Sequence, residues 1–209
     1  MINKPKNWDE VDTDHRNFNA PVPGVYLCKI IAVKKAKSKS NRNMLIVMLD
    51  INDDGKFDGY FGKLEMLQIG KGWSNIKWGL SAYFVLDFDD PQFGHIFTAN
   101  FKKFLLNVKS FDPDFEFDWN TGESLIGKKI AALVCIKEFL TRQGNVRQAH
   151  RVQKTYPLKK FQAGYLDTPW IENTDGERIP YANTNVNPNT REDRDHATLF
   201  DSDVDGPFV

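Results

Sequence analysis

Short apolar segments of strand length, divided by turn signals, constrain the fold of this chain more than any other feature. Residues 25–33 alternate between apolar and other side chains, and residues 44–51 are almost wholly apolar. Both patterns predict β-strands, with the polar residues 34–43 as the loop that joins them. The tripeptide Asp53-Asp54-Gly55 is a turn signal, after which residues 56–62 are expected to return as a third strand.

A helix and a hairpin are expected further along the chain. Apolar residues recur at helical spacing from Phe101 to Val108, and Thr98 is the expected N-cap of this amphipathic helix. Residues 130–140 and residues 146–156 are predicted to form two strands, because a Gly-Asn turn signal separates them. The helix is expected to cover one end of a sheet.

Three strands, a helix and a two-stranded hairpin, in this order, form the element sequence of the OB-fold. We therefore expect a mainly β protein built on a five-stranded OB-fold-like Greek-key barrel, with one amphipathic helix between strands 3 and 4. This domain would span residues 24–162, with an irregular aromatic insertion at residues 63–97. Residues 1–23 are expected to form an N-terminal arm. Residues 163–209 are expected to form an extended or disordered acidic tail with a partner-docking tip at residues 201–209.

The charge of the chain is divided between these parts. The whole chain has 28 basic and 28 acidic residues and a net charge of zero. Residues 163–209 contain 10 acidic and 3 basic residues, so residues 1–162 carry the opposite excess of +7. A basic body with an acidic tail suggests that the body binds phosphates, and that the tail competes for that surface or recruits another protein.

Basic residues fall in the two loops with which an OB-fold binds oligonucleotides. Aromatic side chains could stack on bases, and Trp73 and Trp78 are the two expected to be exposed. The other aromatic candidates are Tyr26, Tyr60, Phe61, Phe139 and Tyr156, although most aromatic residues are core residues and lysine-rich loops are often only solvated turns. The predicted DNA-binding residues are Lys34, Lys35, Lys37, Lys39, Arg42, Trp73, Trp78, Arg142, Arg147 and Arg151.

Strand periodicity limits how the basic residues of the last predicted strand can act together. Arg147 and Arg151 have odd positions, whereas Lys154 has an even one. In a regular strand, side chains of opposite parity point to opposite faces of the sheet. A regular strand would therefore not direct all three residues into one groove.

Patterns of metal sites and active sites are incomplete in this chain. Residues 50–55 match the first half of a calcium loop, but Phe61 stands where the bidentate glutamate should be. The four histidines are scattered singly, without the spacing of zinc ligands or a nucleophile to activate. We therefore expect no catalytic residues, no cofactor and no metal, with a metal-dependent nuclease assembled from distant carboxylates as an open alternative.

Cysteine usage and hydropathy indicate the compartment. Cys28 and Cys135 lie in predicted buried strands, so they are expected to pack as small apolar residues in a reducing environment and not to form a disulfide. The longest apolar run without charge, residues 130–136, is far shorter than a membrane span. We expect a cytoplasmic protein without membrane contact.

The last nine residues combine spaced aspartates with a final Pro-Phe-Val. This pattern resembles the acidic tip of bacterial and phage single-stranded DNA-binding proteins, where an acidic run ends in Pro-Phe and recruits replication and repair proteins. Here Val209 follows the Phe, and Gly206 stands where a larger apolar residue is usual. The resemblance implies that the docking residues are Asp201, Asp203, Asp205, Pro207 and Phe208.

A second resemblance covers most of residues 7–165. The segments 101–105, 112–119 and 125–129, together with the turn Gly144-Asn145-Val146-Arg147, resemble a family of phage proteins found among replication and recombination genes. The two resemblances imply a sequence-independent single-stranded DNA-binding protein of phage replication, recombination or repair, in the host cytoplasm, with a dimer or higher oligomer as an option. An interaction adaptor that uses the same tail is the alternative.

Overall fold

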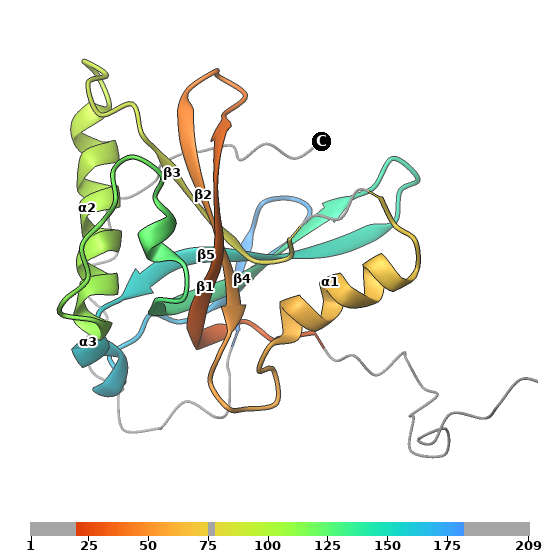
Figure 1. The fold of residues 1–209 in the computed structure, drawn as a ribbon. Helices are drawn as coiled ribbons and strands as arrows, with labels where there is room; N and C mark the ends of the chain where they lie inside the picture. The colour runs from red at the N-terminus through yellow and green to blue at the C-terminus, as the bar shows by residue number, and fades with distance from the viewer. Residues whose placement is uncertain (1–19, 75–77, 182–209) are drawn as a thin grey trace, which may run out of the picture.

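The computed structural model describes residues 20–74 and 78–181, and these residues form a mainly β structure (Figure 1). Seven strands make one mixed sheet in which β4 and β6 are parallel and the other pairs are antiparallel. The prediction of a mainly β fold is therefore confirmed, whereas the described residues form an open sheet of seven strands in place of the expected five-stranded barrel. The strands are β1 (Gly24–Lys37), β2 (Asn43–Ile51), β3 (Ser81–Val85), β4 (Lys129–Leu140), β5 (Val146–Tyr156), β6 (Trp170–Glu172) and β7 (Arg178–Pro180).

The first strand changes partner along its length. Gly24 to Lys29 pair with β4, whereas Cys28 to Lys37 pair with β2 across a bulge between Ile30 and Ala32. Because a bulge bends a strand and increases its twist, β1 can run from one part of the sheet into the other. β2 continues to β3, and β4 pairs with β5 on its other edge. Residues of β3 also lie close to residues of β5.

The helices differ from the prediction at the position of the expected third strand. The prediction that residues 56–62 form a strand is wrong, because α1 (Tyr60–Gly70) begins there. The buried carboxylate of Asp50 accepts hydrogen bonds from the backbone N–H groups of Phe61 and Gly62, both at 2.9 Å, and so satisfies the first turn of the helix. The third strand of the sheet is β3, inside the segment expected to be irregular.

The long amphipathic helix α2 (Gly94–Phe111) is present but begins earlier than expected. Thr98 is not its N-cap, since its hydroxyl donates to the carbonyl of Gly94 inside the helix. A Cβ at Gly94 would lie 2.2 Å from the carbonyl oxygen of Phe88, so this close approach requires glycine. Phe101 and Phe104 are buried against the strands, as the helical spacing predicts.

The main core lies on one face of the strands. It contains alternate residues of β1, β2 and β4, such as Cys28, Val47 and Ile130, all essentially inaccessible to solvent. A smaller cluster around Leu133, Cys135 and Tyr156 lies on the opposite face of β4, against the short helix α3 (Leu158–Gln162) and Trp170. The two cysteines therefore face different clusters, and both are free, as predicted.

Part of the predicted tail belongs to the sheet. Residues 170–180 were expected to lie in an extended or disordered tail; of these, residues 170–172 and 178–180 form the paired strands β6 and β7, so this part is ordered in the sheet. Asp167 fixes the approach to β6 by accepting hydrogen bonds from Lys154 Nζ at 2.5 Å and from the hydroxyl of Tyr156 at 2.7 Å. Within the described residues, no helix has the length and apolar character needed to cross a membrane.

Candidate nucleic-acid interface

A basic and an aromatic side chain lie in one row across the face of β1, β2 and β3 that points away from the core. Lys34 pairs with Ile46, and Ile46 pairs with Tyr83. Residues directly opposite one another in a ladder share a face, and the neighbouring row Val33, Val47 and Ala82 packs into or against the core. Lys34 is exposed and Tyr83 is 42% exposed, so the row offers a cation and a ring to a ligand.

The basic residues of the predicted first loop are mostly strand residues. β1 extends to Lys37, so Lys34, Lys35 and Lys37 belong to it, and the connection to β2 is only a tight turn at residues 38–42. The prediction of a loop at residues 34–43 is therefore wrong at both ends. Lys34, Lys35 and Lys37 are extended because each pairs with a residue of β2. Their side chains remain exposed to solvent.

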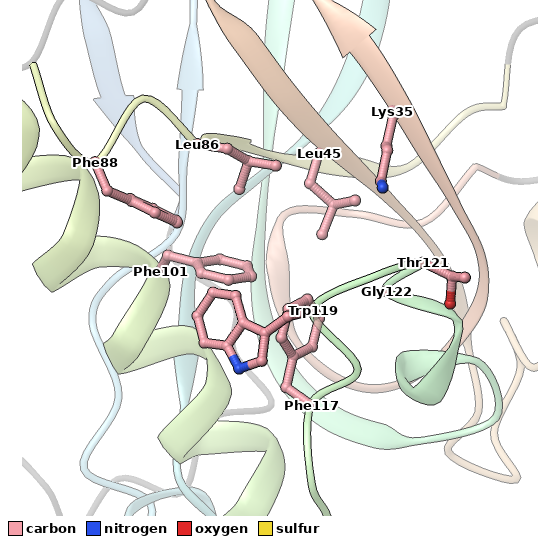
Figure 2. Close-up of a pocket in the computed structure, with 9 residues that line it drawn as sticks. All are labelled: Lys35, Leu45, Leu86, Phe88, Phe101, Phe117, Trp119, Thr121 and Gly122. Atoms are coloured by element: carbon pink, nitrogen blue, oxygen red, sulfur yellow. The ribbon is translucent and has the colours of Figure 1, made fainter.

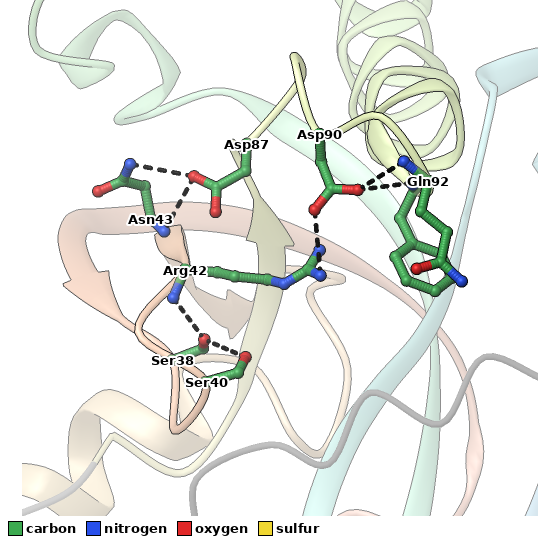
Figure 3. Close-up of polar contacts among 8 residues, drawn as sticks. Ser38, Ser40, Arg42, Asn43, Asp87, Asp90 and Gln92 are labelled. Atoms are coloured by element: carbon green, nitrogen blue, oxygen red, sulfur yellow. Dashed lines mark hydrogen bonds and ion pairs between the residues drawn. The ribbon is translucent and has the colours of Figure 1, made fainter.

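Arg42 is tied to the segment that leads into α2 (Figure 3). Its guanidinium lies 3.1 Å from the carboxylate of Asp90 and over the rings of Phe93 and Phe97, at 5.4 and 5.0 Å from their centroids. The backbone N–H groups of Phe93 and Gln92 and the charge of Arg42 lower the pKa of Asp90. Arg42 thus connects the turn with the segment that leads into α2, and its predicted part in DNA binding stays a prediction.

The hairpin of β4 and β5 carries a second basic and aromatic face. Phe139 pairs with Arg147 and Cys135 pairs with Arg151, so these residues share the face opposite the main core. Phe139 is 41% exposed and Arg147 is exposed, while Arg142 is exposed in the turn. Figure 1 shows this hairpin and the β1–β2 hairpin projecting in different directions.

A bulge in β5 changes the parity argument made for its basic residues. The register shifts between Leu133 and Val134, which pair with Lys154 and Val152. Lys154 therefore lies on the same face as Arg147 and Arg151, and the expectation of opposite faces, which assumed a regular strand, does not hold. Lys154 is nevertheless occupied by its ion pair with Asp167 at 2.5 Å.

The aromatic candidates separate into core and surface residues. Trp73 is 58% exposed after α1, as expected. Trp78 was expected to be exposed but is half-buried, because its indole N–H donates to the carbonyl of Leu49 at 2.6 Å. Four candidates named for stacking are core residues instead: Tyr26, Tyr60, Phe61 and Tyr156.

An aromatic hollow lies beside the β1–β2 hairpin (Figure 2). Trp119 lies at this hollow, and 68% of its surface is exposed. It was not among the predicted binding residues, because the acidic residues around it indicated a solvated connecting segment. Tyr83 was missed as well, although the alternation of buried Ala82 with exposed Tyr83 is a strand signal. The residues that line the hollow are Lys35, Leu45, Leu86, Phe88, Phe101, Phe117, Trp119, Thr121 and Gly122.

Several predicted features are not described by the structure or receive no support from it. The docking residues Asp201, Asp203, Asp205, Pro207 and Phe208 lie outside the described residues, as does most of the predicted arm. Among residues 20–74 and 78–181, no three His, Cys, Asp or Glu side chains are grouped so that they could hold a metal ion. The carboxylate of Asp50, which begins the calcium-like segment, is engaged by α1.

Comparison with known proteins gives no family. No protein-family model matches the chain, and no curated protein is significantly similar to it.

Proposed function

We propose that this chain is a sequence-independent single-stranded DNA-binding protein of phage replication, recombination or repair. The observation that carries the proposal is the row of Lys34, Ile46 and Tyr83 across the outer face of β1, β2 and β3. A ring that stacks on any base, next to a cation that follows the backbone, is the combination used by proteins that bind single strands without sequence preference.

The strand connections support an OB-fold-like barrel as the framework. β1 pairs with both β2 and β4, β2 pairs with β3, β4 pairs with β5, and β3 lies close to β5. α2 follows β3 and precedes β4, as the helix of an OB-fold does. In that fold, the face of strands 2 and 3 and the loops 1–2 and 4–5 bind oligonucleotides. The exposed Arg142 and Arg147 of the β4–β5 hairpin would then extend the interface begun at Lys34.

The acidic C-terminal tip would recruit replication or recombination proteins, as its resemblance to the tip of single-stranded DNA-binding proteins implies. The opposite charges of body and tail further suggest that the tail weakens DNA binding by competing for the basic surface. A chain that lacks residues 200–209 is therefore expected to bind oligo-dT more tightly than the full chain at low salt. Equal affinities would remove this competition from the proposal.

The direct test is the affinity of labelled oligo-dT for the full chain, measured by fluorescence anisotropy. Tyr83→Ala is expected to weaken binding by about 5-fold to about 100-fold, the usual range for losing one stacked base. Lys34→Ala is expected to reduce the slope of affinity against salt concentration by about 0.7, the value for one phosphate contact to a single strand.

The control is Tyr165→Ala, which removes a tyrosine that is 66% exposed in the segment between α3 and β6. This variant is expected to bind like the wild type. Absence of oligo-dT binding by the wild type at low salt would overturn the proposal and leave the interaction adaptor. Binding that Tyr83→Ala and Tyr165→Ala leave equally unchanged would show that the β1–β3 face is not the interface.

A further inference from the structure

The hollow beside the β1–β2 hairpin has the form of a site for one small planar group. Its enclosed space of about 50 Å³ is far smaller than a site that surrounds a whole ligand, so a planar group would enter it only in part and keep one side toward solvent. Leu45 and Phe101 are almost fully buried beneath it, and Phe88 and Phe117 stand beside them (Figure 2). The hollow is mainly apolar. Among the described residues that line it, Lys35, Thr121 and Trp119 have a polar group in the side chain.

Trp119 is exposed yet held in place. Its ring meets Phe117 edge-on with centroids 4.9 Å apart and an interplanar angle of 90°. The turn that carries it is fixed by Asp118, whose carboxylate accepts hydrogen bonds from the backbone N–H of Asn120 at 2.9 Å and from the hydroxyl of Thr121 at 2.5 Å. Gly122 completes the turn with a left-handed φ of 78°. A fixed, exposed indole loses little conformational freedom when a second ring stacks on it.

Lys35 connects this hollow with the outer face of the sheet. Lys34 and Lys35 are consecutive residues of β1, so their side chains leave the strand on opposite faces. Lys34 lies in the row with Tyr83, and Lys35 lines the hollow. Among the described residues, the part of β1 after Ile30 has β2 as its only strand partner, and the segment around Glu123–Leu125 lies close to β1. A nucleic-acid strand that passes the edge of β1 opposite β2 would pass both lysines.

The charge at the hollow suits a phosphate-bearing ligand. Lys35 Nζ donates to the carbonyl oxygen of Asn120 at 2.5 Å, so a neutral group positions the ammonium. The nearby Asp118 carboxylate is engaged by its own turn, and its hydrogen bonds lower its pKa, with Lys35 as a smaller cause. The ammonium group of Lys35 is therefore available to bind an anion at the hollow.

We infer that the hollow receives one base of the bound strand, which stacks on Trp119 while its phosphate contacts Lys35. This inference rests on the proposed function, because it assigns a second contact point to the same single-stranded DNA. A strand that lies on Tyr83 would pass the edge of β1 that is opposite β2 and turn one base into the hollow.

The experiment is an abasic scan. A short oligo-dT is synthesised with one abasic position at a time, and its affinity for the full chain is measured by anisotropy. If one base enters the hollow, Trp119→Ala weakens binding of the intact oligonucleotide by about 5-fold to about 100-fold. Removing the base that enters the hollow also weakens binding to the wild-type protein. The same abasic oligonucleotide binds the Trp119→Ala variant as tightly as the intact oligonucleotide does. Trp119→Phe retains part of the affinity, and Tyr165→Ala leaves the whole scan unchanged.

Outcomes separate this inference from the proposed function. If Tyr83→Ala weakens binding while Trp119→Ala gives the same affinity and the same abasic scan as the wild type, the base site is overturned and the proposed function stands. A wild type that does not bind oligo-dT overturns both. If Trp119→Ala instead abolishes binding of a synthetic peptide of residues 200–209 and leaves oligonucleotide affinity unchanged, the hollow belongs to the tail, and the inference is overturned. Unfolding midpoints equal to the wild type show that each variant is folded.

Discussion

The two hairpins that the sequence presents as basic loops differ in how they are attached to the rest of the molecule. The β1–β2 hairpin is fastened at its turn, where Arg42 contacts Asp90 and two phenylalanine rings and Asn43 donates to Asp87. The hydrogen bonds of the β4–β5 turn described here are internal, between Thr141, Gly144 and Asn145. The same sequence signal, basic residues at a turn, thus corresponds to a tethered hairpin in one region and a projecting one in the other.

Under the proposed function, this difference would give two ways of holding a single strand. A tethered hairpin keeps its lysines in fixed positions, so little ordering entropy is lost when a strand binds. The β4–β5 hairpin would instead offer the exposed side chains of Phe139 and Leu140, and ordering these side chains on binding would cost conformational entropy. Substitutions in the β1–β2 turn are therefore expected to change mainly the free energy of unfolding, and substitutions in the β4–β5 turn mainly the affinity for DNA.

The largest difference between the hairpins is expected in the free energy of unfolding when an arginine of each turn is replaced. Arg42→Ala should lower the free energy of unfolding by about 1–2 kcal/mol, mainly because it removes two cation–π contacts, while the partly exposed ion pair with Asp90 contributes less. Arg142→Ala, in the exposed turn of the other hairpin, should change it by less than about 0.5 kcal/mol. Urea unfolding followed by circular dichroism measures both. Equal losses in the two variants would contradict the distinction between the hairpins.

A smaller effect, on DNA binding, is expected in the projecting hairpin. Changing Arg142 and Arg147 together to alanine should weaken oligo-dT binding about tenfold at low salt and reduce the salt slope by about 1.4, since two phosphate contacts are lost. Unfolding by urea should be unaffected. The charge-matched control changes Lys102 and Lys103, both exposed on α2. A salt slope that stays at the wild-type value in the hairpin variant would place this hairpin outside the interface.

Acid should loosen the tethered hairpin. The pKa of Asp90 is lowered in the folded state by hydrogen bonds from Phe93 and Gln92 and by Arg42. A lowered folded pKa means that the group contributes stability above its unfolded pKa and loses it as the pH falls through the folded pKa. Wild type should therefore lose more of its urea midpoint between pH 6 and pH 3 than Asp90→Asn does. Parallel pH profiles of the two proteins would refute this assignment.

Sequence reasoning found the parts of the fold that are specified locally. The strands β2, β4 and β5 follow from apolar runs and turn residues, and the buried face of α2 follows from helical spacing. α1 was missed because its first turn is satisfied by Asp50, ten residues before Tyr60, a contact that no local pattern contains. β3 was missed because it is only five residues long and follows a glycine-rich segment.

The candidate site was predicted in part for the same reason. The sequence identified Lys34, Arg142 and Arg147 as exposed cations, because charge and exposure are correlated residue by residue. It could not separate Arg42 from them, since Asp90 and Phe97 come from a segment about fifty residues away. The row with Tyr83 and the hollow at Trp119 depend on strand register and on packing between distant segments, which no sequence pattern specifies.

The smallest effect is expected from the residues with left-handed backbone in the two turns. Asn41 has φ 61° in the β1–β2 turn, and Gly144 has φ 79° in the β4–β5 turn. Asparagine tolerates this conformation better than other side chains, and open space surrounds the position where a Cβ would be built on Gly144. Gly144→Asn should therefore change the free energy of unfolding by less than about 0.5 kcal/mol, whereas Gly144→Val should cost about 1–2 kcal/mol. If urea unfolding shows equal costs for the two variants, the projecting turn is held by contacts beyond its own backbone, and the contrast with the tethered hairpin is weaker than the hydrogen bonds indicate.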